Sequence, residues 1–185
     1  MKIYKFNKIE TREDIYPLCL NLIKKGLEVE AFLLILATWN FARFRYAVRG
    51  FKLSKFKEII KRLKPYFKKL KNENFRTINF DKYKNEIEYI FATLSKIKGI
   101  EQTGASKLIH LKNPKVFVMW DGFIRRYYGF RKGNSEDYFN FLKKMQKLFR
   151  NEKVSSKSRT LAKLIDEHNY ITISRPALDK KKKII

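Results

Sequence analysis

The sequence has little of the chemistry that builds covalent cross-links or metal centres. It contains one cysteine, Cys19, which excludes an intramolecular disulfide and a four-cysteine zinc or iron–sulfur site. Its two histidines, His110 and His168, stand apart from other ligand residues, and no histidine or carboxylate cluster points to a catalytic metal. We therefore expect a protein that needs no cofactor, with Cys19 as a small buried side chain.

Long apolar runs are also missing. The most apolar stretch, Ala31 to Ala37, is seven residues long, whereas a helix needs about 20 residues to cross a bilayer. The segment MKIYKFNKIETRED lacks the apolar core of a signal peptide. Together with the single thiol, these features favour a cytoplasmic protein without a membrane partner.

Glycine and proline are scarce, with seven and four residues, so little interrupts the helical periodicity of the chain. We expect an all-α, two-lobed bundle of eight to ten short helices. The helices expected from the pattern cover 12–25, 28–48, a stretch from Ser54 that Pro65 breaks or kinks, 81–97, and a stretch from Ser135. Tyr170 to Ser174 alternates with β-branched residues and is interpreted as one short strand.

The division into domains follows from the same pattern. No linker or internal repeat is visible, so residues 1–185 are expected to form a single helical unit. The stretch 71–80 is the best candidate for a crossing between two lobes. One lobe would hold 1–75 with the C-terminal segment, and the other 76–150.

Positive charge is what the sequence has in excess. There are 43 Lys and Arg against 18 Asp and Glu, a formal net charge of +25. Such a protein repels copies of itself, which favours a monomer, and attracts polyanions, of which nucleic acid is the commonest. Between Phe51 and Asn72, nine basic residues accompany one acidic residue, which indicates either a solvated face or a face that contacts phosphates.

The most informative segment is a candidate helical hairpin over 88–112. Gly99 and Gly104 are expected to bracket a tight turn because glycine tolerates the left-handed conformation. A second helix would follow at once, with Ala105 allowing close approach of its partner helix. Such a hairpin directs backbone amides and a helix N-terminus outward, which makes a phosphate site that needs no base contact.

Residues 97–129 resemble the helix-hairpin-helix DNA glycosylase superfamily, which includes endonuclease III, MutY and 8-oxoguanine glycosylase. Gly99, Ile100 and Ala105 fall on the first glycine, the apolar residue and the alanine of the family hairpin. Asp121, preceded by Phe117 to Trp120, falls on the catalytic aspartate. The resemblance implies a two-lobed all-α fold, binding to duplex DNA, and excision of a damaged or mismatched base in base-excision repair.

The hairpin departs from the family at three positions. Lys98 stands where the family has proline, Glu101 replaces the second glycine, and Thr103 occupies the position of the lysine that attacks the sugar. Threonine cannot form a Schiff base, so the resemblance implies a monofunctional enzyme in which water attacks. The alternative is that Lys98 or Lys107 substitutes for the missing lysine.

Asp121 has a physical reason to be catalytic. Cleavage of an N-glycosidic bond builds positive charge on the sugar, and a nearby carboxylate stabilises that charge most in the transition state. The carboxylate can also orient or deprotonate the attacking water. The alternative is that Asp121 only caps the helix GFIRRYY that follows it.

The remaining site predictions concern the residues that contact DNA and those that bind the extruded base. An extruded base needs a pocket with an aromatic side chain to stack on. The candidates are Trp120 and Trp39, with Asn40 beside Trp39. The alternative is that both tryptophans are core residues. The hairpin carbonyls of 99–103 are where a monovalent cation would bind in the family. The residues expected to contact DNA are Gly99, Glu101, Gln102, Gly104, Ser106, Arg125 and Arg126.

Two alternatives to an enzyme remain open at this point. The first is a noncatalytic helix-hairpin-helix module that binds DNA or structured RNA, which the threonine at position 103 favours. The second is a basic structural protein assembled on an RNA scaffold, which only the charge supports.

Overall fold

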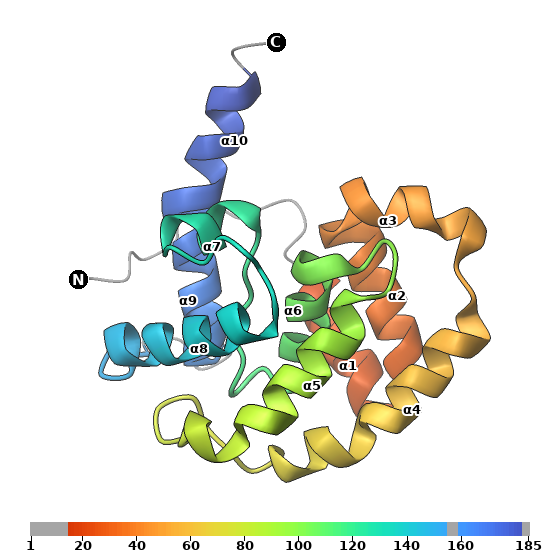
Figure 1. Ribbon diagram of the computed structural model, residues 1–185, viewed down its shortest axis with the longest axis horizontal. Coiled ribbons are helices and arrows are strands. Elements are labelled where there is room, and N and C mark those ends of the chain that lie inside the picture. The colour runs from red at the N-terminus through yellow and green to blue at the C-terminus, as the bar shows by residue number, and fades with distance from the viewer. Residues whose placement is uncertain (1–14, 155–158, 183–185) are drawn as a thin grey trace.

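The computed structural model describes residues 15–154 and 159–182, and the regular elements within these ranges are all helical (Figure 1). The predicted all-α class is therefore confirmed. The ten α-helices in these ranges are α1 (Ile15–Lys24), α2 (Glu28–Trp39), α3 (Phe41–Ala47), α4 (Leu53–Lys69), α5 (Lys84–Ser95), α6 (Glu101–Lys112), α7 (Gly122–Tyr127), α8 (Ser135–Phe149), α9 (Leu161–Asn169) and α10 (Arg175–Lys182). The start of the helix predicted over 12–25 lies outside the described residues.

The strand predicted at Tyr170 to Ser174 is wrong. This segment is a π-helical turn that joins α9 to α10. Within it Thr172 donates a hydrogen bond from its hydroxyl to the carbonyl of His168 at 2.7 Å. The β-branched side chains therefore sit in a helix because the flanking helices continue through them, which overrides their strand preference.

The central helix α2 has the buried character that its apolar sequence predicts. Ala31, Phe32, Ile35 and Leu36 are buried in the core, and Cys19 of α1 is buried against α2, with its thiol 3.5 Å from the carbonyl of Ala31. The predicted continuation of this helix to Val48 is wrong, because Asn40 leaves helical geometry and ends α2. The short helix α3 then starts at Phe41.

Helix α4 passes through Pro65 without ending there. Its apolar stripe of Phe56, Ile60, Leu63 and Phe67 is buried, and this packing holds the helix although proline cannot donate a backbone hydrogen bond. The helix carries its basic residues on the exposed side. This placement is compatible with both alternatives for the segment, a solvated face and a phosphate-contacting face.

The helices gather on two sides of the molecule. In Figure 1, α1 to α6 lie on one side, and α9 and α10 lie with α7 and α8 on the other. Helix α9 also contacts the first side, where the ammonium of Lys163 lies 5.0 Å from the ring centroid of Tyr16 in α1 and 4.7 Å from that of Trp39 in α2. Helices α5 and α8 pack together, with the rings of Phe91 and Tyr138 stacked at 4.4 Å between centroids. Within the described ranges, no helix is both long and apolar enough to cross a membrane.

Candidate active site and nucleic-acid interface

The turn between α5 and α6 is tight and left-handed, as predicted, but the residues that shape it differ. Gly99 has a φ of 85° and Glu101 a φ of 51°. A positive φ at a residue with a side chain is uncommon and costs energy, so the surrounding contacts must impose it. Gly104 does not bracket the turn. It lies inside α6, where a side chain would meet the Asn40 amide nitrogen at 2.9 Å.

Asn40 is the residue that holds the turn in place. Its buried side-chain amide donates hydrogen bonds to the carbonyl of Gly99 at 2.9 Å and to that of Ile100 at 3.3 Å. Asn40 is a predicted base-pocket residue, but these bonds use its side chain to connect the end of α2 to the hairpin. They also occupy two carbonyls of the stretch that the family uses to bind a monovalent cation.

The first turn of α6 connects the hairpin to the segment that carries Asp121. The carbonyl of Gln102 accepts a hydrogen bond from the indole nitrogen of Trp120 at 3.2 Å. The hydroxyl of Ser106 accepts one from the backbone amide of Trp120 at 3.2 Å and lies within 3.1 Å of its carbonyl. Ser106 is fully buried, so its hydroxyl ties α6 to Trp120 and does not face solvent.

Asp121 caps α7 and is also fixed from the far end of the chain. One carboxylate oxygen accepts hydrogen bonds from the backbone amides of Phe123 at 2.7 Å and Ile124 at 2.9 Å. The other accepts one from the hydroxyl of Ser174 at 2.6 Å. Asp121 as a residue is half-buried. The capping role weighed for this residue is present, and it orients the carboxylate that a catalytic role would need.

The two tryptophans have different surroundings. Trp120 is a core side chain, almost fully buried among Phe91, Tyr138 and Phe141. Trp39 is half-buried and lies near-parallel to Tyr16, with 5.9 Å between ring centroids. Trp39 is therefore the more exposed of the two tryptophans, with Tyr16 packed against its ring.

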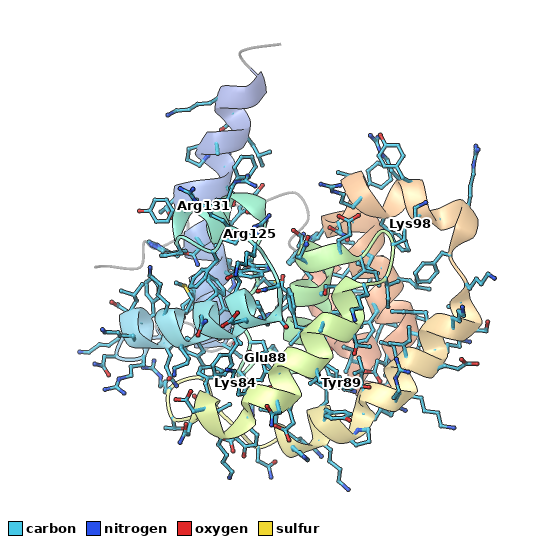
Figure 2. The ribbon with its side chains drawn as sticks, viewed as in Figure 1. Lys84, Glu88, Tyr89, Lys98, Arg125 and Arg131 are labelled. Carbon is cyan, nitrogen blue, oxygen red and sulfur yellow. The ribbon has the colours of Figure 1, made fainter. Side chains whose placement is uncertain are left out.

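Arg125 and Arg126 point in different directions, as adjacent helical residues must. The guanidinium of Arg125 donates hydrogen bonds to the carbonyls of Phe130 at 3.1 Å and Arg131 at 2.5 Å, so it braces the loop after α7. Arg126 is exposed and lies 5.3 Å from the ring centroid of Phe123. In Figure 2, Arg125 and Arg131 lie on the α7 side of the molecule, whereas Lys98 lies at the hairpin turn.

The two lysines considered as substitutes for the family lysine differ in their exposure and in their contacts. Lys98 is exposed on the hairpin turn. The ammonium of Lys107 donates a hydrogen bond to the carbonyl of Trp39 and is half-buried. Thr103 is half-buried in the first turn of α6, and its carbonyl accepts a hydrogen bond from Ser106 at 2.9 Å.

A buried polar cluster close to Trp39 was not predicted from the sequence. The ammonium of Lys163 lies 4.7 Å from the ring centroid of Trp39 and 5.0 Å from that of Tyr16. It forms ion pairs with Asp166 at 2.9 Å and Glu167 at 3.5 Å. Burial raises the pKa of Tyr16, and the two carboxylates add to this effect. The residues come from α1, α2 and α9, so no local pattern could have joined them.

His110 belongs to the same cluster. Its Nδ1 lies 2.5 Å from the carbonyl of Phe117 and its Nε2 lies 2.8 Å from the hydroxyl of Tyr16. A carbonyl only accepts, so Nδ1 carries the proton and Nε2 accepts from Tyr16. Burial lowers the pKa of His110 to about 4, against smaller opposing contributions from Asp166 and the Phe117 carbonyl. His110 is therefore a packed structural side chain.

We expect the stability of the protein to fall as the pH drops below about 6.5. The unfolded chain takes up a proton on His110 near that pH, whereas the folded protein does so only near a pKa of about 4. The unfolded state then binds more protons, which costs about 2 kcal/mol of unfolding free energy at pH 5. Denaturant unfolding at pH 7.5 and pH 5 measures this loss.

His110→Gln provides the comparison, because it removes one titrating group and should reduce the pH dependence. His168 contributes a loss of the same sign, because burial lowers its pKa as well. His168→Gln is measured alongside to separate the two contributions. An unchanged pH dependence in His110→Gln would show that His110 is not responsible.

Within the described ranges, no group of three or more histidines, cysteines, aspartates or glutamates could hold a metal ion. Comparisons of the chain with protein-family models, with curated proteins and with solved structures find no match.

Proposed function

We propose that the protein is a monofunctional DNA glycosylase, which binds duplex DNA through the α5–α6 hairpin and hydrolyses the N-glycosidic bond of a damaged or mismatched base with Asp121. The observation that carries the proposal is the position of Asp121. This half-buried residue directly follows Trp120, which is hydrogen-bonded to Gln102 and Ser106 in the first two turns of α6. The carboxylate and the hairpin are thus parts of one braced unit.

The geometry of the turn supports the binding half of the proposal. Two left-handed residues, Gly99 and Glu101, reverse the chain, and Asn40 fixes the carbonyls between them. The amides of Ile100 and Glu101 donate to the carbonyl of Ile97 at 3.0 and 3.2 Å, so the next amides in the first turn of α6 are the ones that would meet an anion. The carboxylate of Glu101 lies 3.5 Å from the guanidinium of Arg43, which offsets its repulsion of a phosphate.

The chemistry requires a water molecule and one carboxylate. The bond between the sugar C1′ and the base nitrogen breaks, the electron pair leaves with the base, and the water oxygen bonds to C1′. Asp121 stabilises the positive charge that develops on the sugar and accepts a proton from the attacking water. Asp121 then releases this proton to solvent, and the departing base takes one proton from solvent, so that the base leaves as its neutral N–H form. Three hydrogen bonds hold the carboxylate in place before the reaction, so little reorganisation is needed.

A hydrolytic reaction is favoured over a Schiff-base reaction by the residues near the hairpin. Thr103 has no amine, and the ammonium of Lys107 is already bonded to the carbonyl of Trp39. A lysine attacks carbon through its side-chain nitrogen, and in Lys107 this nitrogen is turned towards the carbonyl of Trp39.

The alternative function is a noncatalytic helix-hairpin-helix module that binds DNA or structured RNA. A specific observation favours it: both oxygens of Asp121 accept hydrogen bonds from the protein, which a purely structural cap would also do. The net charge of +25 supports either function equally.

The test is incubation of the purified protein with duplexes that each carry one lesion or mismatch, followed by alkali to cleave abasic sites. We expect alkali-dependent strand breaks with at least one substrate and no covalent complex after borohydride reduction. Duplex binding without any breakage would support the noncatalytic alternative. Preferential binding to folded RNA would support an RNA-binding module, and a borohydride-trapped complex would show that a lysine attacks.

A further inference from the structure

The exposed face of α3 presents aromatic rings and arginines to solvent beside the hairpin turn. Phe41 is 54% exposed and Tyr46 is 71% exposed, although large aromatic side chains are usually buried. The guanidinium of Arg45 lies between them, 4.5 Å from the ring centroid of Tyr46 and 5.6 Å from that of Phe41. Just beyond α3, Val48 is 55% exposed. Phe41, Arg45, Tyr46 and Val48 are called the α3 face below.

The α3 face is rigidly attached to the hairpin. On the opposite side of α3, Phe44 and Ala47 are buried, and a side chain at Gly99 would overlap the Cβ of Ala47. Asn40, the residue before α3, donates to the carbonyls of Gly99 and Ile100. Arg43 of α3 pairs with Glu101 of the hairpin at 3.5 Å. A nucleic acid held at the turn therefore has the α3 face as a fixed neighbour.

The charge around the α3 face selects a polyanionic partner. No aspartate or glutamate occurs between Glu30 and Glu58, whereas Arg43, Arg45 and Arg49 all fall within that stretch. A neutral apolar partner would desolvate the guanidiniums of Arg45 and Arg49 without offering them an opposite charge, which is costly. An anionic membrane is a weaker fit because α3 spans only seven residues, and two exposed aromatic rings do not make the broad apolar face of an interfacial helix.

We propose that the α3 face stacks on unpaired nucleobases that adjoin the duplex held by the hairpin. Aromatic rings and arginine guanidinium planes are the usual stacking surfaces for single-stranded nucleic acid. In an intact duplex the base faces are already stacked, so the α3 face gains a partner only where bases are unpaired, as at a tail, gap or bulge. The inference rests on the proposed function only in that the hairpin binds duplex DNA, and it requires no catalytic step.

The experiment compares the affinity of the full chain for a blunt duplex and for the same duplex with a short tail of unpaired thymines, by fluorescence anisotropy. Wild type should bind the tailed duplex more tightly. The double variant Phe41→Ala/Tyr46→Ala should lose that preference, with affinity for the tailed duplex falling roughly 5- to 150-fold, the range expected for loss of stacking on one base. Affinity for the blunt duplex should change by less than about 2-fold, because the hairpin contacts are intact.

Two controls separate stacking from other effects. Phe41→Tyr/Tyr46→Phe keeps both rings and should keep the preference, and Tyr127→Ala removes an aromatic of similar exposure from α7 and should also keep it. A 2-aminopurine in the tail should be quenched on binding to wild type and not on binding to the alanine double variant.

The proposal fails if wild type does not prefer the tailed duplex, or if the alanine double variant retains the preference. It also fails if the α3 substitutions abolish binding to phosphatidylserine vesicles but leave tailed-duplex binding intact, since that result would identify a membrane surface. These outcomes are independent of base excision. Absent excision with a retained tail preference would refute the glycosylase alone, and excision without a tail preference would refute the α3 inference alone.

Discussion

Replacement of Asp121 by asparagine is expected to lower the rate of base excision by about 10²- to 10³-fold, the loss typical when one preorganised electrostatic group is removed from an active site. Asparagine has the same shape as aspartate but carries no charge, so it cannot stabilise the positive sugar of the transition state or accept a proton from water. Single-turnover kinetics on the substrate found in the lesion screen measure the chemical step directly.

The substitution is expected to leave the fold and the affinity for duplex DNA nearly unchanged. Asparagine is as good a helix cap as aspartate, and its side-chain oxygen can accept the same bonds from the amides of Phe123 and Ile124. The amide group can donate to the hydroxyl of Ser174, which accepts as readily as it donates. Duplex affinity should therefore change by less than about 3-fold, since the hairpin contacts do not involve this charge.

Asp137→Asn is the matched control for the loss of one carboxylate. Asp137 also accepts a hydrogen bond from a backbone amide, that of Gly133 at 2.7 Å, but it belongs to the first turn of α8 and not to the segment joined to the hairpin. The excision rate of the Asp137→Asn variant should be close to that of wild type. A wild-type rate in Asp121→Asn would mean that Asp121 is only a cap, and the proposed mechanism would be wrong.

The parts of the structure that could be predicted from the sequence are those fixed by local signals. The helical periodicity with few glycines and prolines predicts the all-α class, and the run from Ala31 to Ala37 predicts a buried central helix. Asp121 before a short helical stretch predicts the cap at α7. In each case the relevant interactions lie within a few residues of one another along the chain.

The parts that could not be predicted depend on partners far apart in the sequence. Asn40 ends α2 because its side chain bonds to the carbonyls of Gly99 and Ile100, about 60 positions away. Glu101 takes a left-handed conformation that its residue type disfavours, and Gly104 sits in a helix interior that glycine disfavours. At these positions tertiary packing outweighs local preference.

The candidate active site also depends on contacts between residues that lie far apart in the sequence. Ser174 reaches Asp121 across 53 positions, from a π-helical turn whose sequence favours a strand. Trp120 is next to Asp121 in the chain, but the helical core formed with α5 and α8 buries it. Adjacency in sequence therefore identified the segment but not which of its side chains face the core.

Gly99→Ala is expected to lower the unfolding free energy by about 2–5 kcal/mol. Two effects add. A left-handed conformation costs a residue with a side chain about 1–2 kcal/mol, and a buried clash with a neighbouring Cβ costs about 1–3 kcal/mol. The clash arises because the new Cβ would overlap the Cβ of Ala47, which cannot rotate away. Denaturant unfolding with a check of the m-value measures the change.

Two further variants separate the strain from the clash. Gly129 has a φ of 91° and no atom within 4 Å of an added Cβ, so Gly129→Ala should cost only the left-handed term of about 1–2 kcal/mol. Ala47→Gly in the Gly99→Ala background removes the overlapping Cβ and should recover part of the loss, although glycine in a helix costs up to about 1 kcal/mol. Equal losses in the Gly99 and Gly129 variants would show that α3 does not press on the turn.

The same series tests whether the turn binds DNA. If its amides hold a phosphate, the displacement of α3 that relieves the clash in Gly99→Ala must also move the carbonyls bonded to Asn40, and duplex affinity should fall even where the protein remains folded. Gly129→Ala should bind duplex as wild type does, and Ala47→Gly should restore part of the affinity lost in Gly99→Ala. A folded Gly99→Ala protein with unchanged duplex affinity would separate the hairpin from the DNA contact and leave the positive charge of the surface as the only basis for binding.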